Sequence, residues 1–325
     1  MDASLDTGFA PVGTRGGFDA AALPRRRRRA NKPLSPIETR LNRPAFHDPS
    51  APMPADTPRR PDRKPDDRRT ERRPHRRAPA TRSHWSPGEN RIVIYGVHAV
   101  AAALANPARV KHRLVATHNA LARLSEAGID LPVAPEVADP KVVAEMVPAD
   151  AVHQGIALVT EPLAPAEVGD LGEARLVLAL DQVTDPHNVG AIMRSAVALG
   201  ASALFTTSRH SPQESGVLAK AASGAVDLLP HASVPNLPRT LRDLKDEGFT
   251  IIGLDSEAEH DLESVPVGDK VALVLGSEGK GLRGAVKTAA DAVARLEAPG
   301  PFASLNVSNA AAIALYVMRR RLVGG

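Results

Sequence analysis

The last 150 residues alternate short, uninterrupted apolar runs with segments of helical periodicity, and this pattern limits the fold most strongly. Runs such as 176–180 and 271–275 lack the polar residue at every second position that a half-exposed strand would show. Continuous apolar strands are typical of parallel sheets, in which helices cover both faces. We therefore predict that residues 175–323 form a doubly wound α/β domain with a mostly parallel sheet.

A shorter stretch of the same kind precedes this domain. Residues 91–162 read as strand, glycine turn and helix, followed by further strands and helices, and they predict a small α/β domain. Residues 163–174, which are rich in Ala, Gly and Pro, are interpreted as a linker.

The first quarter of the chain has a different composition. Residues 1–88 hold 14 of the 29 prolines and the run Arg25 to Arg29. The first 90 residues carry 20 Lys and Arg against 11 Asp and Glu, whereas the rest carries 21 against 26. So few apolar residues cannot offset the entropy of ordering, and we expect a disordered basic tail. Either this tail contacts RNA phosphates, or it is a solvated extension with no specific partner.

Several classes of protein are disfavoured. The chain contains no cysteine, and its 11 histidines show no metal-ligand spacing, so we expect no metal site. The longest apolar run, 310–318, is too short to span a bilayer, and the N-terminus does not read as a signal peptide. These observations predict a soluble, cytoplasmic protein that does not associate with membranes.

Gly279, Gly281 and Gly284 spell G-x-G-x-x-G after an apolar strand. A dinucleotide-binding loop would start at the strand end and need an acidic residue about 20 positions later, within a longer domain. Here the strand ends near Leu275, and too little chain follows. A phosphate-binding P-loop fails as well, because Ser or Thr would have to follow Lys280. Neither nucleotide interpretation fits.

Two other polar stretches follow strands in the same domain. Residues 185–196 contain Asn188 and Arg194, and residues 303–316 place several Ser and Asn before the last helix. Taken singly, Asn188 and Ser308 could be helix N-caps, because such side chains accept from the first helical N–H groups.

Together, in this order, the three stretches resemble the motifs of the SpoU family of RNA ribose 2′-O-methyltransferases, within the knotted SPOUT class. The first motif matches Asn188, Gly190 and Arg194; the second matches Gly276, Glu278, Gly279 and Gly281; the third matches 304–308. Residues 91–162, with IYGVHAV and HQGI, resemble the RNA substrate-binding domain of ribosomal-protein L30e type found in the 23S rRNA guanosine-2′-O-methyltransferase subgroup. In one departure, Leu296-Glu297-Ala298 replaces the usual Ile-Pro-Met-like strand end.

The resemblance implies S-adenosylmethionine as cofactor, bound in a C-terminal knot, and a homodimer acting on ribosomal RNA. It implies a cofactor site formed by Leu275, Gly276, Leu296 and Leu305. It also implies that the catalytic group consists of Arg194, Asn188, Glu278, Ser304 and Asn306. A guanidinium is a poor base, so we expect Arg194 to hold a phosphate and stabilise the developing alkoxide. For Glu278, a carboxylate that merely accepts helix N–H groups is the alternative.

Two other functions stay open at this point. One is a tRNA guanosine 2′-O-methyltransferase of the same family. The other is a non-catalytic RNA-binding protein of ribosome assembly that keeps the fold without the chemistry. The intact motif residues argue against the second, and the extra domain, through resemblance, favours ribosomal RNA.

Overall fold

The computed structural model describes residues 88–300 and 305–324, and all of them belong to one compact unit, Arg76–Gly325. The predicted basic tail, residues 1–88, lies outside the described residues except for Gly88. No helix in the described ranges is long and apolar enough to cross a membrane.

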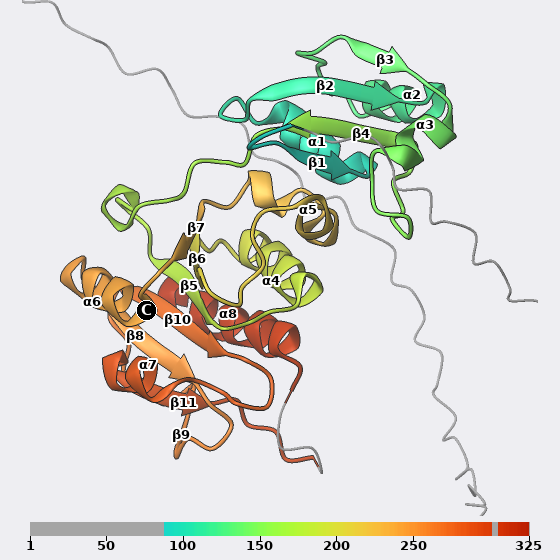
Figure 1. Cartoon of the computed structure of the whole chain (residues 1–325). Helices are drawn as coiled ribbons and strands as arrows, with labels where there is room; N and C mark the ends of the chain where they lie inside the picture. Colours follow the sequence, from blue (N-terminus) through green and yellow to red (C-terminus); the bar gives the residue numbers. More distant parts are fainter. Residues whose placement is uncertain (1–87, 301–304, 325) are drawn as a thin grey trace, which may run out of the picture. The chain divides into compact units, whose positions relative to one another are not determined.

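Residues 91–162 contain a four-stranded sheet in the order β1-β4-β2-β3 (Figure 1). Strand β4 pairs antiparallel with β1 and β2, and β3 adds parallel to β2. Helices α1 and α2 cover one face, where their apolar residues belong to a core cluster shared with the larger domain, and α3 covers the other face through a small separate cluster. The elements are β1 (Ile92–Tyr95), α1 (Val97–Ala105), β2 (Lys111–Ala116), α2 (His118–Glu126), β3 (Pro135–Val137), α3 (Pro140–Glu145) and β4 (Ile156–Thr160).

The larger sheet has seven strands in the order β7-β6-β5-β10-β8-β11-β9, and every neighbouring pair is parallel. Residues in β5 and β6 are buried throughout, which explains why they read as continuous apolar runs. The predicted mostly parallel α/β sheet is thus confirmed. Its strands are β5 (Leu176–Asp181), β6 (Ala203–Thr207), β7 (His231–Val234), β8 (Phe249–Leu254), β9 (His260–Asp261), β10 (Lys270–Gly276) and β11 (Ala292–Arg295).

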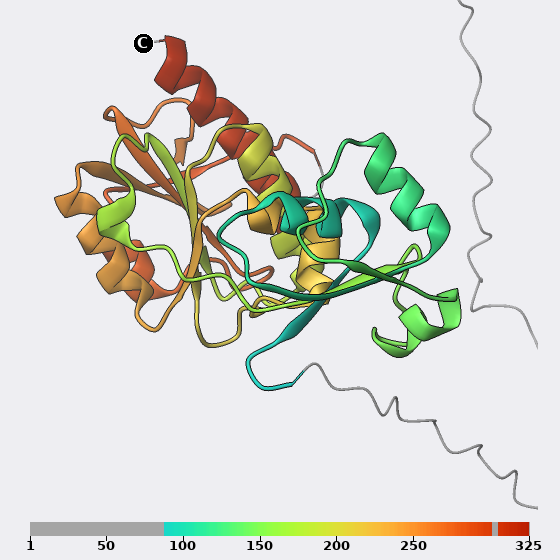
Figure 2. The same cartoon turned by 90° about the horizontal axis from the view of Figure 1, so that it is seen from above.

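Helices cover both faces of this sheet (Figures 1 and 2). One apolar cluster joins the sheet to α4, α5 and α8, and a second joins it to α6 and α7. Their apolar faces supply the burial that stabilises the domain. The helices are α4 (Pro186–Ala198), α5 (Gly216–Ala222), α6 (Leu237–Asp246), α7 (Gly284–Ala289) and α8 (Val307–Gly324).

The structure differs from the sequence-based expectations in three places. The Pro-rich stretch after α5 contains edge strand β7, which the pattern did not predict because prolines flank it. Residues 216–226 read as one helix in the sequence, but α5 ends at Ala222, because Ser223 and Gly224 adopt left-handed conformations and a 3₁₀ turn, η2 (Ala225–Asp227), follows. The expected linker is packed on the larger sheet and contains the turn η1 (Val168–Asp170).

Candidate functional site

The candidate site lies at the carboxyl ends of the adjacent parallel strands β5 and β10. Helix α4 follows β5, the glycine loop 277–283 follows β10, and α8 packs against both α4 and β10. Ligand sites of open parallel sheets occur at this edge, because the loops after several strands meet there. The three sequence motifs are therefore carried by three segments that converge at one place.

Three motif side chains form one hydrogen-bonded group. The Nδ2 of Asn306 donates to Glu278 Oε1 at 2.7 Å and to Asn188 Oδ1 at 3.1 Å. The Nδ2 of Asn188 donates to the same Glu278 oxygen at 3.2 Å. The Val307 backbone N–H, at the start of α8, also points at this oxygen, at 3.4 Å. The Glu278 carboxylate thus accepts hydrogen bonds from the side-chain amides of both Asn188 and Asn306. Its contact with the first N–H group of α8 is the longest of the three.

The alternative interpretation of Asn188 and Ser308 as N-caps is wrong in this structure. Asp185 is the N-cap of α4, and its carboxylate accepts from the His187 N–H at 2.9 Å. Before α8, Asn306 Oδ1 accepts from the Ser308 N–H at 2.9 Å, so Asn306 takes the capping role. The Asn188 side chain is free to face Glu278.

A cavity of about 590 Å³ opens beside this group. All four residues expected at the cofactor lie in its wall: Leu275, Gly276, Leu296 and Leu305. Polar residues, including Asp255, Glu257, Glu278 and Lys280, line the rest. The volume is in the range of cofactor sites, and the wall combines apolar side chains with three carboxylates and two lysines.

The glycine loop turns sharply back on its own strand. A Cβ at Gly276 would lie 2.2 Å from the carbonyl carbon of Gly281, so only glycine allows this approach. Gly279 and Gly281 have φ of 80° and 62°, the left-handed region that favours glycine. These glycines shape a cavity wall at the end of β10, which agrees with the rejection of a dinucleotide-binding fingerprint.

A second cavity, of about 500 Å³, shares part of this wall. Ser277, Glu278, Lys280 and Val307 line both cavities, while Asn188 and His210 line the second alone. Members of the hydrogen-bonded group therefore line both spaces.

Two expected residues are not part of this group. Arg194 is exposed, lines neither cavity, and its guanidinium makes no hydrogen bond or ion pair within the described residues. The family resemblance implies that Arg194 belongs with Glu278, Asn188 and Asn306, but these three side chains bond to one another and not to Arg194 within one chain. Ser304 lies outside the described residues.

Two ion pairs beside the site were not predicted from the sequence. Asp181, at the end of β5, is 1 % exposed, and its carboxylate accepts from the Arg283 backbone N–H at 3.0 Å and from Nε at 2.7 Å. Because Asp181 also pairs with Gly276 across the sheet, this contact brings both ends of the glycine loop to one residue. The one sequence signal for this ion pair was the position of Asp181, an acidic residue at the end of an apolar strand.

The second pair joins Asp255 to Lys287 in the wall of the larger cavity, at 2.5 Å. Burial alone would raise the pKa of Asp255, but the Lys287 ammonium and the Glu257 N–H outweigh it and lower this pKa. No group of three His, Asp or Glu side chains in the described ranges is arranged to hold a metal ion.

Comparison with known proteins agrees with this geometry. Residues 175–316 match the SpoU rRNA Methylase family, and residues 93–166 match a domain described as RNA 2′-O ribose methyltransferase substrate binding. A 23S rRNA (guanosine-2′-O-)-methyltransferase RlmB from Photobacterium profundum is 35% identical over 247 residues, which cover 71% of this chain and 98% of that protein. The chain belongs to the SpoU rRNA methylase family.

Other similar proteins point the same way. The RlmB of Xylella fastidiosa is 42% identical over 180 residues, covering 53% of this chain and 72% of the relative. The SpoU methyltransferase AviRb of Streptomyces viridochromogenes, solved with AdoMet, has a TM-score of 0.61 at 23% identity and covers 73% of this chain and 92% of its own. An AdoMet-bound rRNA methyltransferase from Sinorhizobium meliloti has a TM-score of 0.60 at 24% identity, and the match covers 72% of this chain and 88% of that chain. These structures share the SpoU fold.

Proposed function

We propose that this chain transfers a methyl group from S-adenosylmethionine to the ribose 2′-hydroxyl of a guanosine in 23S rRNA. The observation that carries the proposal is the Asn188–Glu278–Asn306 group, whose members line two cavities at the edge of the sheet. RlmB relatives, which act on 23S rRNA guanosine by name, align with both of its domains and support this substrate over tRNA.

The larger cavity fits the cofactor. Leu275, Leu296 and Leu305 offer an apolar wall for the purine, and Gly276 lets the loop backbone approach the ligand. The acidic side chains Glu257 and Glu278 suit a cationic ligand. When bound, S-adenosylmethionine supplies an electrophilic methyl group on a sulfonium.

The chain's own residues then position the ribose. Glu278 holds the amides of Asn188 and Asn306 in place, and these amides orient the ribose by hydrogen bonds in the second cavity. Oriented reactants behave as if highly concentrated, so positioning supplies much of the acceleration. Arg194 grips an RNA phosphate and stabilises the developing alkoxide, a role that its exposed and unpaired guanidinium permits, while that phosphate or a water takes the proton of the 2′-hydroxyl. The family motif also assigns Ser304 a catalytic role.

The domains have separate roles in this proposal. Residues 91–162 form the L30e-type domain that binds RNA, 163–174 connect it to the next domain, and 175–323 form the knotted methyltransferase domain. The contact of Asn306 with the glycine loop supports a knot, since it brings the C-terminal segment beside that loop. Residues 1–88 contact RNA phosphates, and deleting them weakens the salt dependence of binding.

We also infer a cytoplasmic homodimer. Helix α8 exposes Ile313 at 44% and Tyr316 at 56%, and apolar side chains on one helix suit a subunit interface. A second subunit would also bring a further Arg194 to the assembly. Light scattering that returns the mass of a single chain contradicts this part of the proposal.

The decisive experiment is methyl transfer with purified protein and labelled S-adenosylmethionine. We expect label in 23S rRNA, at a ribose that becomes resistant to alkaline cleavage, and none in bulk tRNA. Label in tRNA supports the alternative tRNA enzyme. Cofactor and RNA binding without label supports the non-catalytic alternative. The variant Arg194→Ala should keep cofactor affinity and lose methylation, and a fully active variant contradicts the assigned role.

A further inference from the structure

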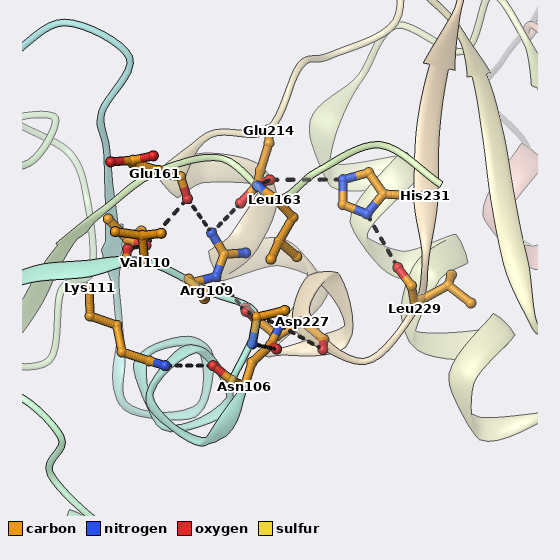
Figure 3. Close-up of polar contacts among 12 residues, drawn as sticks. Asn106, Arg109, Val110, Lys111, Glu161, Leu163, Glu214, Asp227, Leu229 and His231 are labelled. Carbon is orange, nitrogen blue, oxygen red and sulfur yellow. Dashed lines mark hydrogen bonds and ion pairs between the residues drawn. The ribbon is translucent and has the colours of Figure 1, made fainter. Parts of the chain in front are cut away.

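A buried charged cluster joins the two domains of the described unit, and the proposed chemistry does not use it. Arg109 follows α1, Glu214 precedes α5, and Asp227 ends η2. Arg109 Nη1 lies 2.7 Å from Glu214 Oε1 and donates to the Glu161 carbonyl at 2.9 Å, while Nε donates to Asp227 Oδ1 (Figure 3). The three charged side chains are 0%, 6% and 1% exposed.

The Arg109 guanidinium faces two carboxylates, and His231 Nε2 lies 4.0 Å from the second oxygen of Glu214. Burial raises the pKa of Asp227, although hydrogen bonds from Arg109 and Asn106 oppose this effect. Arg109 Nη2 and Asp227 Oδ2 have no hydrogen-bond partner among the described residues. Such clusters add little net stability compared with apolar packing. Displacing one partner is nevertheless costly, because it leaves a buried charge without its counter-charge. The cluster therefore favours one relative position of the two domains, because a shift of either domain would separate these charges.

Close backbone contacts beside the cluster favour the same relative position of the two domains. A Cβ at Gly216, the first residue of α5, would lie 2.1 Å from the Val93 carbonyl oxygen in β1. A Cβ at Gly224 would lie 2.7 Å from that of Ala102 in α1. Helix α5 thus rests directly on the small domain, where packed surfaces do not slide freely.

The other side of α5 leads to the candidate active site. A Cβ at Gly190 in α4 would lie 2.6 Å from Ala221 Cβ and 2.8 Å from its carbonyl carbon. Two residues before Gly190, the same helix carries Asn188, which binds Glu278. A continuous packed path therefore runs from the small domain through α5 to the site.

We propose that Arg109 is a specificity-determining positioning residue, which locks the small domain on α5 and so fixes the distance from bound RNA to the methyl-transfer site. The proposal rests on the function proposed above. The enzyme selects its nucleotide by that distance, because RNA held by the small domain presents only one ribose to the second cavity. Arg109 itself does not touch RNA, since its side chain is fully buried.

The test compares Arg109→Gln with Arg113→Gln. Arg113 lies in the same domain and pairs with Glu136 at the surface, so its variant loses the same charge without touching the cluster. We expect Arg109→Gln to lower the ratio of target to neighbouring-nucleotide methylation about tenfold or more, with cofactor affinity within about twofold. Arg113→Gln should keep the wild-type ratio. An unchanged ratio in Arg109→Gln overturns the proposal.

Two further measurements separate this inference from the proposed activity. The chain has no cysteine, so Glu126→Cys and Arg242→Cys, both at exposed positions, allow spin labels on the two domains. We expect one narrow distance distribution that Arg109→Gln broadens; a broad distribution in the otherwise wild-type chain overturns the lock even if methylation is observed. If Arg109→Gln does not fold, Gly216→Ala keeps every charge and should still broaden the distribution, whereas an unchanged distribution contradicts the proposal.

Discussion

Replacing Gly190 by alanine tests whether α4 and α5 are packed as closely as the structure describes. The new Cβ would lie 2.6 Å from Ala221 Cβ and 2.8 Å from the Ala222 nitrogen. Ordinary carbon contacts need about 3.5 Å or more, so the helices must separate by roughly 1 Å. Two of the close atoms belong to the backbone and cannot rotate away.

The magnitude follows from two opposing effects. Overpacking a core costs about 1–3 kcal/mol, and backbone contacts place this site at the upper end. Alanine in a helix stabilises by roughly 1 kcal/mol relative to glycine. We therefore expect the free energy of unfolding to fall by about 2 kcal/mol. Asn188 lies two residues away, and a shift of about 1 Å there should lower the methylation rate on the order of 100-fold.

The assay is urea unfolding of Gly190→Ala beside Gly284→Ala. Gly284 begins α7, and a Cβ at that position would meet nothing within 4 Å. We expect the control to keep its unfolding midpoint or raise it slightly. Equal changes in both variants, or a Gly190→Ala protein as stable as the wild type, would refute the reasoning.

Three other predictions concern the site and the domain junction. Gly276→Ala places a Cβ 2.2 Å from the backbone of Gly281, so cofactor affinity by calorimetry should fall about tenfold or more, and wild-type affinity contradicts this. Glu278→Gln exchanges a charged acceptor for a weaker neutral one, so the single-turnover rate should fall at least about tenfold, unless the carboxylate merely accepts from the α8 terminus. Burial raises the pKa of Asp227, so the folded chain binds a proton that the unfolded chain has lost, and this contribution disappears as pH rises through the raised pKa. The stability of Asp227→Asn relative to that of the wild type should therefore increase as pH rises above about pH 4, where the unfolded carboxyl loses its proton, and a pH-independent difference contradicts this.

The fold class was predictable because burial on both faces of a strand leaves a local record in the sequence. The runs 176–180 and 271–275 belong to β5 and β10, which pair in parallel at the centre of the sheet. Strand β7 left no such record, since it is a short edge strand between prolines. The family motifs pointed to Gly276 and Leu305 as cofactor-binding residues, and both line the larger cavity. Of the residues expected to be catalytic, Asn188, Glu278 and Asn306 lie together, whereas Arg194 lines neither cavity.

By itself, the sequence determined the alternation of strands and helices and the three polar motifs, because periodicity and motif spacing are properties of neighbouring residues. The tertiary structure decided which distant residues meet. Asn188 and Glu278 are 90 positions apart, and Arg109 and Asp227 are 118 positions apart, yet each pair is in contact. Such contacts depend on strand order and helix packing, and a buried arginine has the same letter as a solvated one. Only the fold buries Arg109 and places it against Glu214 and Asp227, where it connects the two domains.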